Sequence, residues 1–282
     1  SGKTHLIRHY KAMFPARRES ETLIQPLLVS RIPSKLNIEH MMIQMLSDLG
    51  QFGSEYRRGR SKEIGLTESL IKALKSCRTE LIIINEFQEI LEFKSIRDRQ
   101  NIANRLKMIS EEAQIPIVLV GMPWAEQIVE EPQWASRLIC RRIIPYFKLS
   151  NGIEEFVRFL KGLAVRMPFD RPPKLAEKQM ALPLFAYSRG EVRRLKQLLD
   201  EAVKIAVVEA AGPITKDYLI RAHEKMHPGS DNPFKKRVEE LSFSEVASYS
   251  NYYPNAASED EALVGTRFFD SLSLNEILKK SK

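Results

Sequence analysis

The sequence predicts an α/β protein with a parallel sheet flanked by helices, followed by a small all-helical domain and a flexible C-terminal tail. Three observations predict this class. Almost wholly apolar strand patterns alternate with helical patterns in the first half of the chain, which is typical of parallel sheets covered on both faces. The strand patterns stop after Leu149, where only helical patterns continue. The chain also opens on residues typical of a phosphate-binding loop that leads into a helix.

The first half of the chain carries four strand patterns with helical patterns between them. Apolar residues recur at helical spacing in "NIEHMMIQMLSDLG", "LTESLIKALKSC" and "NIANRLKMISEEA". The order β-α-α-β-α-β-α-β predicts one α/β core domain at residues 1–149. The four strands are expected at residues 22–30, 80–86, 115–121 and 141–149.

The second half is expected to be helical and then irregular. "NGIEEFVRFLKGLAVRM" has its apolar residues on one helical face, and the strand signal is absent, so residues 150–226 are expected to form an all-helical domain. From His227 onward, "HPGSDNPF" is typical of a linker, and "SYSNYYPNAASEDEA" predicts disorder or ordering by a partner. Residues 227–282 are therefore predicted to be a linker and tail. Further helices are expected at about 174–186, 190–210 and 215–226.

The first residues match the end of the phosphate-loop pattern Gly-x-x-x-x-Gly-Lys-[Ser/Thr]. Its first glycine would precede Ser1, and the chain does not begin with Met, so we expect further residues upstream. In such a loop Lys3 would reach the β- and γ-phosphates, and the Thr4 hydroxyl would ligate Mg²⁺. Gly2 would let the backbone approach the phosphates closely. The alternative is an incidental Gly-Lys pair at the start of a surface helix.

A second element of the same kind of site ends the strand at residues 80–86. Asn85 would hold Mg²⁺ directly or through water, and Glu86 would orient and deprotonate a water that attacks the γ-phosphate. Asp is usual where Asn85 stands, and Asn brings no negative charge, so we expect weaker Mg²⁺ affinity or slower turnover. The alternatives are a strand-end turn residue for Asn85 and a solvated charge for Glu86.

Composition limits the class of protein. The net charge is +8 with a pI near 9.4, which is compatible with a nucleic-acid partner. No apolar run approaches the roughly 18 residues of a membrane span, so no membrane partner is expected. The two cysteines, Cys77 and Cys140, lack metal-ligand spacing and predict free thiols in a bacterial cytoplasm.

The stretches "LIIINEFQEIL", "IPIVLVGMPWAEQIV", "ASRL" and "SRGEVRRLKQLLDEA" resemble the TnsC/TniB family of AAA+ transposition regulators over about residues 1–226. The resemblance implies an AAA+ phosphate-loop core with a helical lid, and ATP with Mg²⁺ as cofactors. It implies that Arg137 of "ASRL" is an arginine finger acting on a neighbouring subunit, a role that Arg141 and Arg142 could share. Arg193 or Arg194 matches the sensor arginine of the lid. Met122 stands where a polar sensor is usual.

The resembled family assembles on duplex DNA as rings or filaments of identical subunits. The resemblance therefore implies self-association and sequence-independent binding of double-stranded DNA. The loop "EYRRGRSK" is the expected DNA contact, because long arginines in a glycine-containing loop can follow a phosphate backbone without reading bases. A solvated charged loop is the alternative. The candidate DNA-binding residues are Arg57, Arg58, Arg60 and Lys62.

The terminal "TRFFDSLSLNEILKKSK" has an amphipathic pattern that is suited to docking on a partner. In the resembled family the partners are transposase subunits and a target-selection protein. The alternative is a helix that folds back on the lid. The docking residues are expected to be Phe268, Phe269, Leu272, Ile277 and Leu278.

Together these features predict an ATP-dependent regulator of transposition that assembles on DNA, recruits transposase and disassembles on hydrolysis through Glu86 and a neighbour's Arg137. One rival is an AAA+ initiator or helicase loader. The other is a nucleotide-gated scaffold with little hydrolysis, because Asn85 and Met122 both depart from the usual pattern.

Overall fold

The computed structural model describes residues 2–32, 38–50, 63–93, 95–150, 152–210, 212–253, 256, 258 and 261–271. They fall into two compact units. The first unit comprises Gly2–Ile143 and Ser250–Gly265. The second comprises Ile144–Tyr249 with Thr266 and the described residues that follow it.

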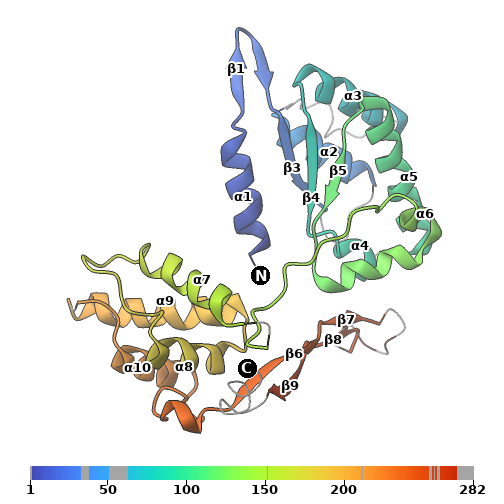
Figure 1. Cartoon of the computed structure of the whole chain (residues 1–282). Coiled ribbons are helices and arrows are strands. Elements are labelled where there is room, and N and C mark those ends of the chain that lie inside the picture. Colours follow the sequence, from blue (N-terminus) through green and yellow to red (C-terminus); the bar gives the residue numbers. More distant parts are fainter. Residues whose placement is uncertain are drawn as a thin grey trace. The chain divides into compact units, whose positions relative to one another are not determined.

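The first unit is an α/β domain built on a parallel sheet (Figure 1). The strands pair in the order β3-β4-β5, and both pairs are parallel. The elements of this unit are α1 (Lys3–Met13), β1 (Arg17–Glu19), β2 (Thr22–Ile24), β3 (Leu27–Arg31), α2 (Ile38–Asp48), α3 (Glu63–Ser76), β4 (Leu81–Asn85), α4 (Glu89–Phe93), α5 (Ile96–Ala113), β5 (Ile117–Leu119), the 3₁₀ helix η2 (Pro123–Glu130), α6 (Pro132–Ala135), β7 (Asn251–Tyr252) and β8 (Leu263–Val264).

Helices cover both faces of the sheet, as its apolar strands predict. Successive residues of β4 alternate between two cores, because side chains of a strand point to opposite faces. Ile82 and Ile84 pack in the large core with α2, α3 and α5. Ile83 packs on the other face with Ile7 of α1, the buried residue of that helix. Figure 1 shows α1 on one side of the sheet and these three helices on the other.

Two strand predictions need correction. The segment 22–30 is not one strand but two: β2 pairs with β1 in an antiparallel hairpin, and β3 begins after Pro26. The predicted strand at 141–149 does not form. A strand requires a hydrogen-bonded neighbour, and among the described strands β5 pairs only with β4. The apolar side chains of Ile143 and Ile144 are 58% and 48% exposed, so they are not strand residues in a core.

The second unit contains the predicted helices. Phe156, Leu160 and Ala164 recur at i, i+4 and i+8 on α7 and are all buried. Gly190, between α8 and α9, has φ of +79°, and a Cβ there would lie 2.0 Å from the Phe147 carbonyl oxygen. Only glycine fits this turn. The elements are α7 (Glu154–Ala164), α8 (Lys178–Ser188), α9 (Val192–Val208), α10 (Lys216–Met226), the 3₁₀ helix η3 (Val238–Glu240), β6 (Phe243–Ser248) and β9 (Arg267–Ser271).

The region expected to be a linker and tail is part of both units. Phe234 and Phe243 are fully buried in the core of the second unit. Glu245 of β6 is 1% exposed and accepts hydrogen bonds from the backbone N–H groups of Leu149 and Ser150, at 2.6 and 2.8 Å. Hydrogen bonds to a carboxylate are stronger than neutral ones. Glu245 therefore fastens β6 to the chain that leads into α7.

The described part of the amphipathic terminus is a strand and not a helix. β9 pairs antiparallel with β6. Phe268 stacks on Tyr146 with ring centroids 6.3 Å apart, and the guanidinium of Arg189 lies over its ring. Phe269, the next residue, is 48% exposed. The two phenylalanines predicted to dock a partner thus differ: Phe268 packs within its own unit, whereas Phe269 faces solvent.

Candidate functional site

The helix α1 begins at Lys3 with its first N–H groups pointing away from the helix. Gly2 is the N-cap with φ of −81°, no described side chain caps it, and the first turn has no acidic residue. The Leu6 N–H donates to the Gly2 carbonyl at 2.9 Å, so the helix is regular from its start. Such a helix N-terminus favours an anion. A Cβ at Gly2 would meet no atom within 4 Å, so close approach of a phosphate remains a prediction there.

The side chain of Lys3 reaches the end of strand β5. Its ammonium Nζ lies 3.1 Å from the Sδ atom of Met122. Thr4, the second predicted ligand residue, is exposed beside it on the first turn of α1. The start of the chain therefore lies at the carboxyl end of the parallel sheet, where α/β proteins bind their ligands.

Asn85 and Glu86 lie at the same edge, where β4 ends. Glu86 has φ of +56°, in the left-handed region that is uncommon for residues other than glycine. The hydrogen bonds from Val120 N–H to Ile84 O and from Phe87 N–H to Val120 O hold the backbone on either side of it. Backbone conformations of this kind often occur at functional sites.

Gln88, a residue that was not predicted from the sequence, joins Glu86 to the end of β5. Its side-chain Nε2 donates to Glu86 Oε2 at 2.8 Å, and its Oε1 accepts the Met122 N–H at 3.0 Å. Asn85 Nδ2 lies 3.5 Å from Glu86 Oε1, a longer contact. No sequence pattern separates Gln88 from an ordinary polar residue at the start of α4. Lys3, Glu86 and Met122 are thus connected through short contacts.

The donor atoms at this edge fit a magnesium ion. The Asn85 side-chain oxygen is buried and has no hydrogen-bond partner among the described residues. The Thr4 hydroxyl offers a second oxygen of the kind that Mg²⁺ prefers. No group of three or more His, Cys, Asp and Glu side chains with metal-binding geometry occurs in the described part of the chain. These residues suit an ion held mainly by water and phosphate oxygens.

Two further carboxylates lie behind Glu86 on α4. Burial, followed by the charges of Glu92 and Glu86, raises the pKa of Glu89, and Arg31 at the end of β3 partly lowers it. Burial also raises the pKa of Glu92, whose carboxylate accepts a hydrogen bond from the indole N–H of Trp124. The site is therefore locally acidic, and Arg31 is a nearby cation that the sequence analysis did not single out.

The predicted finger arginines differ in their surroundings. Arg137 is half-buried after α6, and its guanidinium donates to the carbonyl of Gln133. Arg141 and Arg142 are exposed. The Arg142 guanidinium donates to the backbone carbonyl of Arg141 at 3.1 Å. Arg137 would have to leave the Gln133 carbonyl to reach another subunit, whereas the other two arginines are already exposed.

The two candidate sensor arginines are in the second unit. The guanidinium carbon of Arg194 lies 5.1 Å from the centroid of the Tyr187 ring, a cation–π contact. Arg193 is exposed one position earlier on α9. Arg194 therefore has a packing role within its unit, and Arg193 is the better candidate for a ligand contact.

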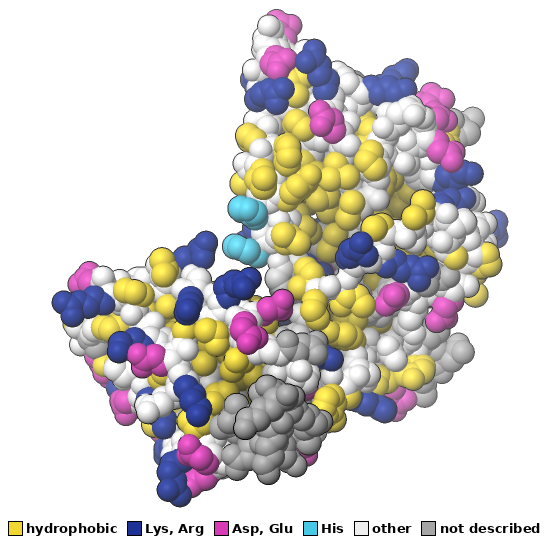
Figure 2. All heavy atoms as spheres, viewed as in Figure 1, with side chains coloured by type: hydrophobic (Ala, Val, Ile, Leu, Met, Phe, Trp, Pro, Cys, Tyr) yellow, Lys and Arg dark blue, Asp and Glu magenta, His cyan; other side chains and the backbone are white. Residues whose placement is uncertain are grey.

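Several predicted residues lie outside the described part of the chain. They are the DNA-binding residues Arg57, Arg58, Arg60 and Lys62 and the docking residues Leu272, Ile277 and Leu278. On the face drawn in Figure 2, the described Lys and Arg side chains are interspersed with Asp and Glu.

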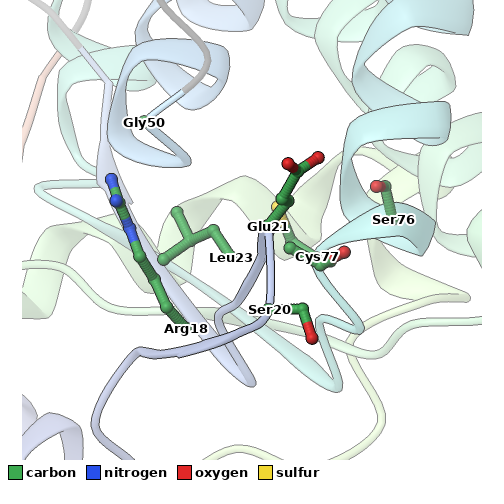
Figure 3. A pocket seen from close by; sticks show the side chains of 8 residues that line it. Arg18, Ser20, Glu21, Leu23, Gly50, Ser76 and Cys77 are labelled. Atoms are coloured by element: carbon green, nitrogen blue, oxygen red, sulfur yellow. The ribbon is translucent and has the colours of Figure 1, made fainter.

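A cavity of about 520 Å³ lies at the opposite, amino end of the sheet (Figure 3). The hairpin of β1 and β2 forms one wall, with Arg18 and Glu21, and the end of α3 forms another, with Ser76 and Cys77. None of the predicted site residues that the structure describes lines it. Among the described residues, no helix is both long and apolar enough to cross a membrane.

Comparison with solved structures assigns the fold to the AAA+ ATPases. The ORC2 protein of Aeropyrum pernix, in its ADPNP-ADP complexes, matches with a TM-score of 0.56 and 18% identity over 85% of this chain. Cdc6p from Pyrobaculum aerophilum matches with a TM-score of 0.56 and 11% identity over 82% of this chain. The chain spans only 62% and 59% of the lengths of these two proteins.

The family follows from a sequence profile described as "Bacterial TniB protein", which matches residues 1–147. The chain belongs to the TniB family. A search of curated proteins finds no match. The matched range includes Lys3, Glu86, Met122 and the arginines from Arg137 to Arg142, whereas the candidate sensor arginines Arg193 and Arg194 lie beyond it.

Proposed function

We propose that this protein binds ATP with Mg²⁺ at the carboxyl end of its sheet and uses the nucleotide to regulate DNA transposition. The main support for the nucleotide site is that Lys3, Glu86 and Met122, which are far apart in the sequence, meet at one edge of the sheet. The start of α1, which no described side chain caps, offers N–H groups to the phosphates, and Lys3 adds a positive charge. Thr4 and Asn85 would hold the magnesium ion, which supplies charge neutralisation on the phosphates.

In this proposal Glu86 orients the attacking water and accepts its proton. An arginine from a neighbouring copy stabilises the charge that develops on the transferred phosphoryl group. Arg137 is the residue that the family resemblance assigns, and Arg141 or Arg142 could take its place from their exposed positions. Hydrolysis would then require that copies of the chain associate.

The proposed partner is double-stranded DNA, bound without regard to sequence. Membership of the TniB family and a net charge of +8 support it. The predicted contact is the loop that carries Arg58 and Arg60. The DNA-bound assembly would recruit transposase subunits, with a target-selection protein as a further partner.

Two other functions are alternatives to the regulation of transposition by ATP hydrolysis. Two residues favour a nucleotide-gated scaffold with little turnover. Asn85 carries no charge, and the side chain of Met122, which lies beside Lys3, is apolar. The other alternative is an initiator or helicase loader, which would have the same AAA+ fold. Capture by the segment from Phe268 to Lys282 separates the last possibility, because it should recover a transposase subunit and not a helicase.

The first test measures ATP binding and hydrolysis by the full-length gene product with Mg²⁺. We expect Lys3→Ala to weaken binding, and Glu86→Gln to keep binding and lose turnover. A wild-type protein that binds ATP but hydrolyses none, with or without DNA, would favour the scaffold. A protein that binds no adenine nucleotide would contradict the proposal.

The second test measures binding of duplex DNA at several salt concentrations. Arg58→Glu with Arg60→Glu should lose most binding at moderate salt, because phosphate contacts by arginine are sequence-independent and salt-sensitive. The exposed pair Arg97→Glu with Lys107→Glu on α5 makes the same change in charge and is the control. Equal losses in the two pairs would contradict a specific role for the loop.

A further inference from the structure

The Gln88 carboxamide lies between the carboxylate of Glu86 and the backbone of β5. It is 6% exposed, so its polar atoms must find partners inside the protein. A backbone N–H can only donate, so the N–H of Met122 requires that the amide oxygen of Gln88 faces it. The amide NH₂ must then face Glu86, to which it donates at 2.8 Å. The two contacts fix the carboxamide in one orientation.

The backbone around Gln88 is also fixed. Its carbonyl accepts the N–H groups of Leu91 and Glu92, at 2.9 and 3.2 Å, which begins α4. On the opposite side, a Cβ at Gly121 would lie 3.2 Å from both the N and Oε1 atoms of Gln88. It would also lie 2.9 Å from the Cβ of Ala125. A glycine at 121 therefore leaves the space in which the Gln88 side chain sits.

We propose that Gln88 is a positioning residue for Glu86 and so replaces the polar side chain that Met122 lacks. The amide donates to one oxygen of the Glu86 carboxylate and holds the group against the end of β5. Among the described residues, the other oxygen of Glu86, Oε1, is contacted only by Asn85 Nδ2, at the longer distance of 3.5 Å. This oxygen is then the one that accepts the proton of the attacking water. The inference rests on the proposed ATP hydrolysis and adds the residue that sets the geometry of its base.

A purely structural role for Gln88 makes a different prediction. Gln127 of η2 is a matched case in the same unit, because its amide also makes two hydrogen bonds, both 3.1 Å long, to the N–H and carbonyl of Tyr252. Loss of either glutamine's amide removes two hydrogen bonds and should lower stability to a similar extent. Only Gln88 contacts a carboxylate, so only its loss should change catalysis.

The experiment compares Gln88→Met with Gln127→Met in the full-length gene product. Methionine keeps the approximate volume and removes both hydrogen bonds. We expect Gln88→Met to lower kcat roughly 10- to 100-fold, because misplacement of a reacting group by about 1 Å has an effect of this size. The KM for ATP and the Kd for nucleotide should stay unchanged, because Gln88 contacts no group proposed to bind phosphate. Gln127→Met should leave kcat unchanged.

A second variant gives a readout that a structural role would not produce. In Gln88→Glu a protonated carboxyl can still donate to Glu86 and accept from Met122, whereas the ionised form can only accept and repels Glu86. Turnover of Gln88→Glu should approach the wild-type rate at low pH and fall to the rate of Gln88→Met as the pH rises. The ratio of the wild-type and Gln88→Met rates should not change with pH in this way.

The outcomes separate the inference from the proposed function. If wild type hydrolyses ATP and Gln88→Met does so equally fast, or Gln88→Glu keeps one ratio to wild type at every pH, the positioning role is wrong and the proposed function stands. If wild type shows no hydrolysis that depends on Glu86, the proposed function fails in its hydrolytic step and the inference fails with it. A selective loss of kcat in Gln88→Met, with pH-dependent recovery in Gln88→Glu, supports both.

Discussion

Lys3 Nζ lies 3.1 Å from Met122 Sδ, so the residue that begins α1 meets the residue that follows β5. A thioether sulfur is a weak hydrogen-bond acceptor. A phosphate oxygen is a far stronger partner for an ammonium group, so a nucleotide can displace the sulfur at little energetic cost. The contact thus marks where the Lys3 side chain reaches and which neighbour it would leave on binding.

Replacement of Lys3 by methionine should weaken ATP binding. Removal of a charge that contacts phosphate should raise the Kd roughly 10- to 100-fold, or about 1.4 to 2.8 kcal/mol. Lys11→Met, in the last turn of the same helix, removes the same charge away from the site and is the control. Titration of a fluorescent ATP analogue with Mg²⁺ measures both. Equal Kd values for the two variants would exclude Lys3 from the site.

Replacement of Asn85 by aspartate should increase the affinity of the site for Mg²⁺. The Asn85 side-chain oxygen is buried and lacks a described partner, and a carboxylate at this position would add the charge that Mg²⁺ prefers. We expect half-maximal hydrolysis at a lower Mg²⁺ concentration. Asn101→Asp, on the exposed side of α5, adds a charge elsewhere and serves as reference. An unchanged Mg²⁺ dependence in Asn85→Asp would contradict this role.

The finger arginine should act on a neighbouring copy. Loss of the true finger should lower hydrolysis by roughly 10³-fold. Single alanine variants of Arg137, Arg141 and Arg142 identify it. When that variant is mixed with Glu86→Gln, sites with an intact Glu86 on one copy and an intact arginine on the next are formed, and part of the activity should return. If no mixture recovers activity, the arginine does not act in trans.

Stability should depend on pH through Glu89. Burial, then the charges of Glu92 and Glu86, raises its pKa above the ordinary 4.5, so the folded protein holds this proton more tightly than the unfolded chain. The free energy of unfolding therefore falls as the pH rises from about 4.5 through the raised pKa. Glu89→Gln removes this penalty, so its stability relative to wild type should increase as the pH rises from about 4.5 and level off above the raised pKa.

Urea unfolding of both proteins at several pH values measures this difference. Glu112→Gln, an exposed position of α5, shows the effect of removing a surface charge. A stability difference for Glu89→Gln that grows as the pH falls would have the wrong sign.

The same substitution should have opposite effects at two glycines of the second unit. Gly190→Ala forces a Cβ against the Phe147 carbonyl oxygen at a φ of +79°, which should cost at least about 2 kcal/mol. Gly162→Ala lies inside α7, where the added Cβ meets only Arg166 Nη1 at 3.6 Å. This change should stabilise the protein by about 0.5 to 1 kcal/mol. Guanidinium unfolding measures both, and a stabilising Gly190→Ala would exclude the strained turn.

The local patterns of the sequence predicted much of the fold. The apolar run before Asn85 forms β4, buried on both faces as a parallel strand, and the four helices α7 to α10 lie where apolar spacing places them. These elements depend on the spacing of apolar residues within one short segment, and this spacing is visible in the sequence alone. The motif residues Lys3 and Glu86 were predicted for the same reason, because each stands at a fixed place relative to its own helix or strand.

Other features depended on partners far away in sequence. The apolar segment 141–149 has a strand pattern but no described strand beside it, and the polar segment after His227 contains a buried Glu245 that is held by Leu149 and Ser150. Neither outcome can be read from the segment itself. A strand is stable only with a neighbour, and a buried carboxylate only with donors.

Local sequence patterns were enough to predict the α/β class, the helices α7 to α10 and the residue types that suit a phosphate and a magnesium ion. The folded chain was needed to see that Gln88 joins Glu86 to Met122 and that Lys3 reaches the same strand end. It also showed that Phe268 packs within its unit while Phe269 faces solvent. The reason is physical: periodicity is set by neighbours along the chain, whereas hydrogen bonds and burial are set by neighbours in space.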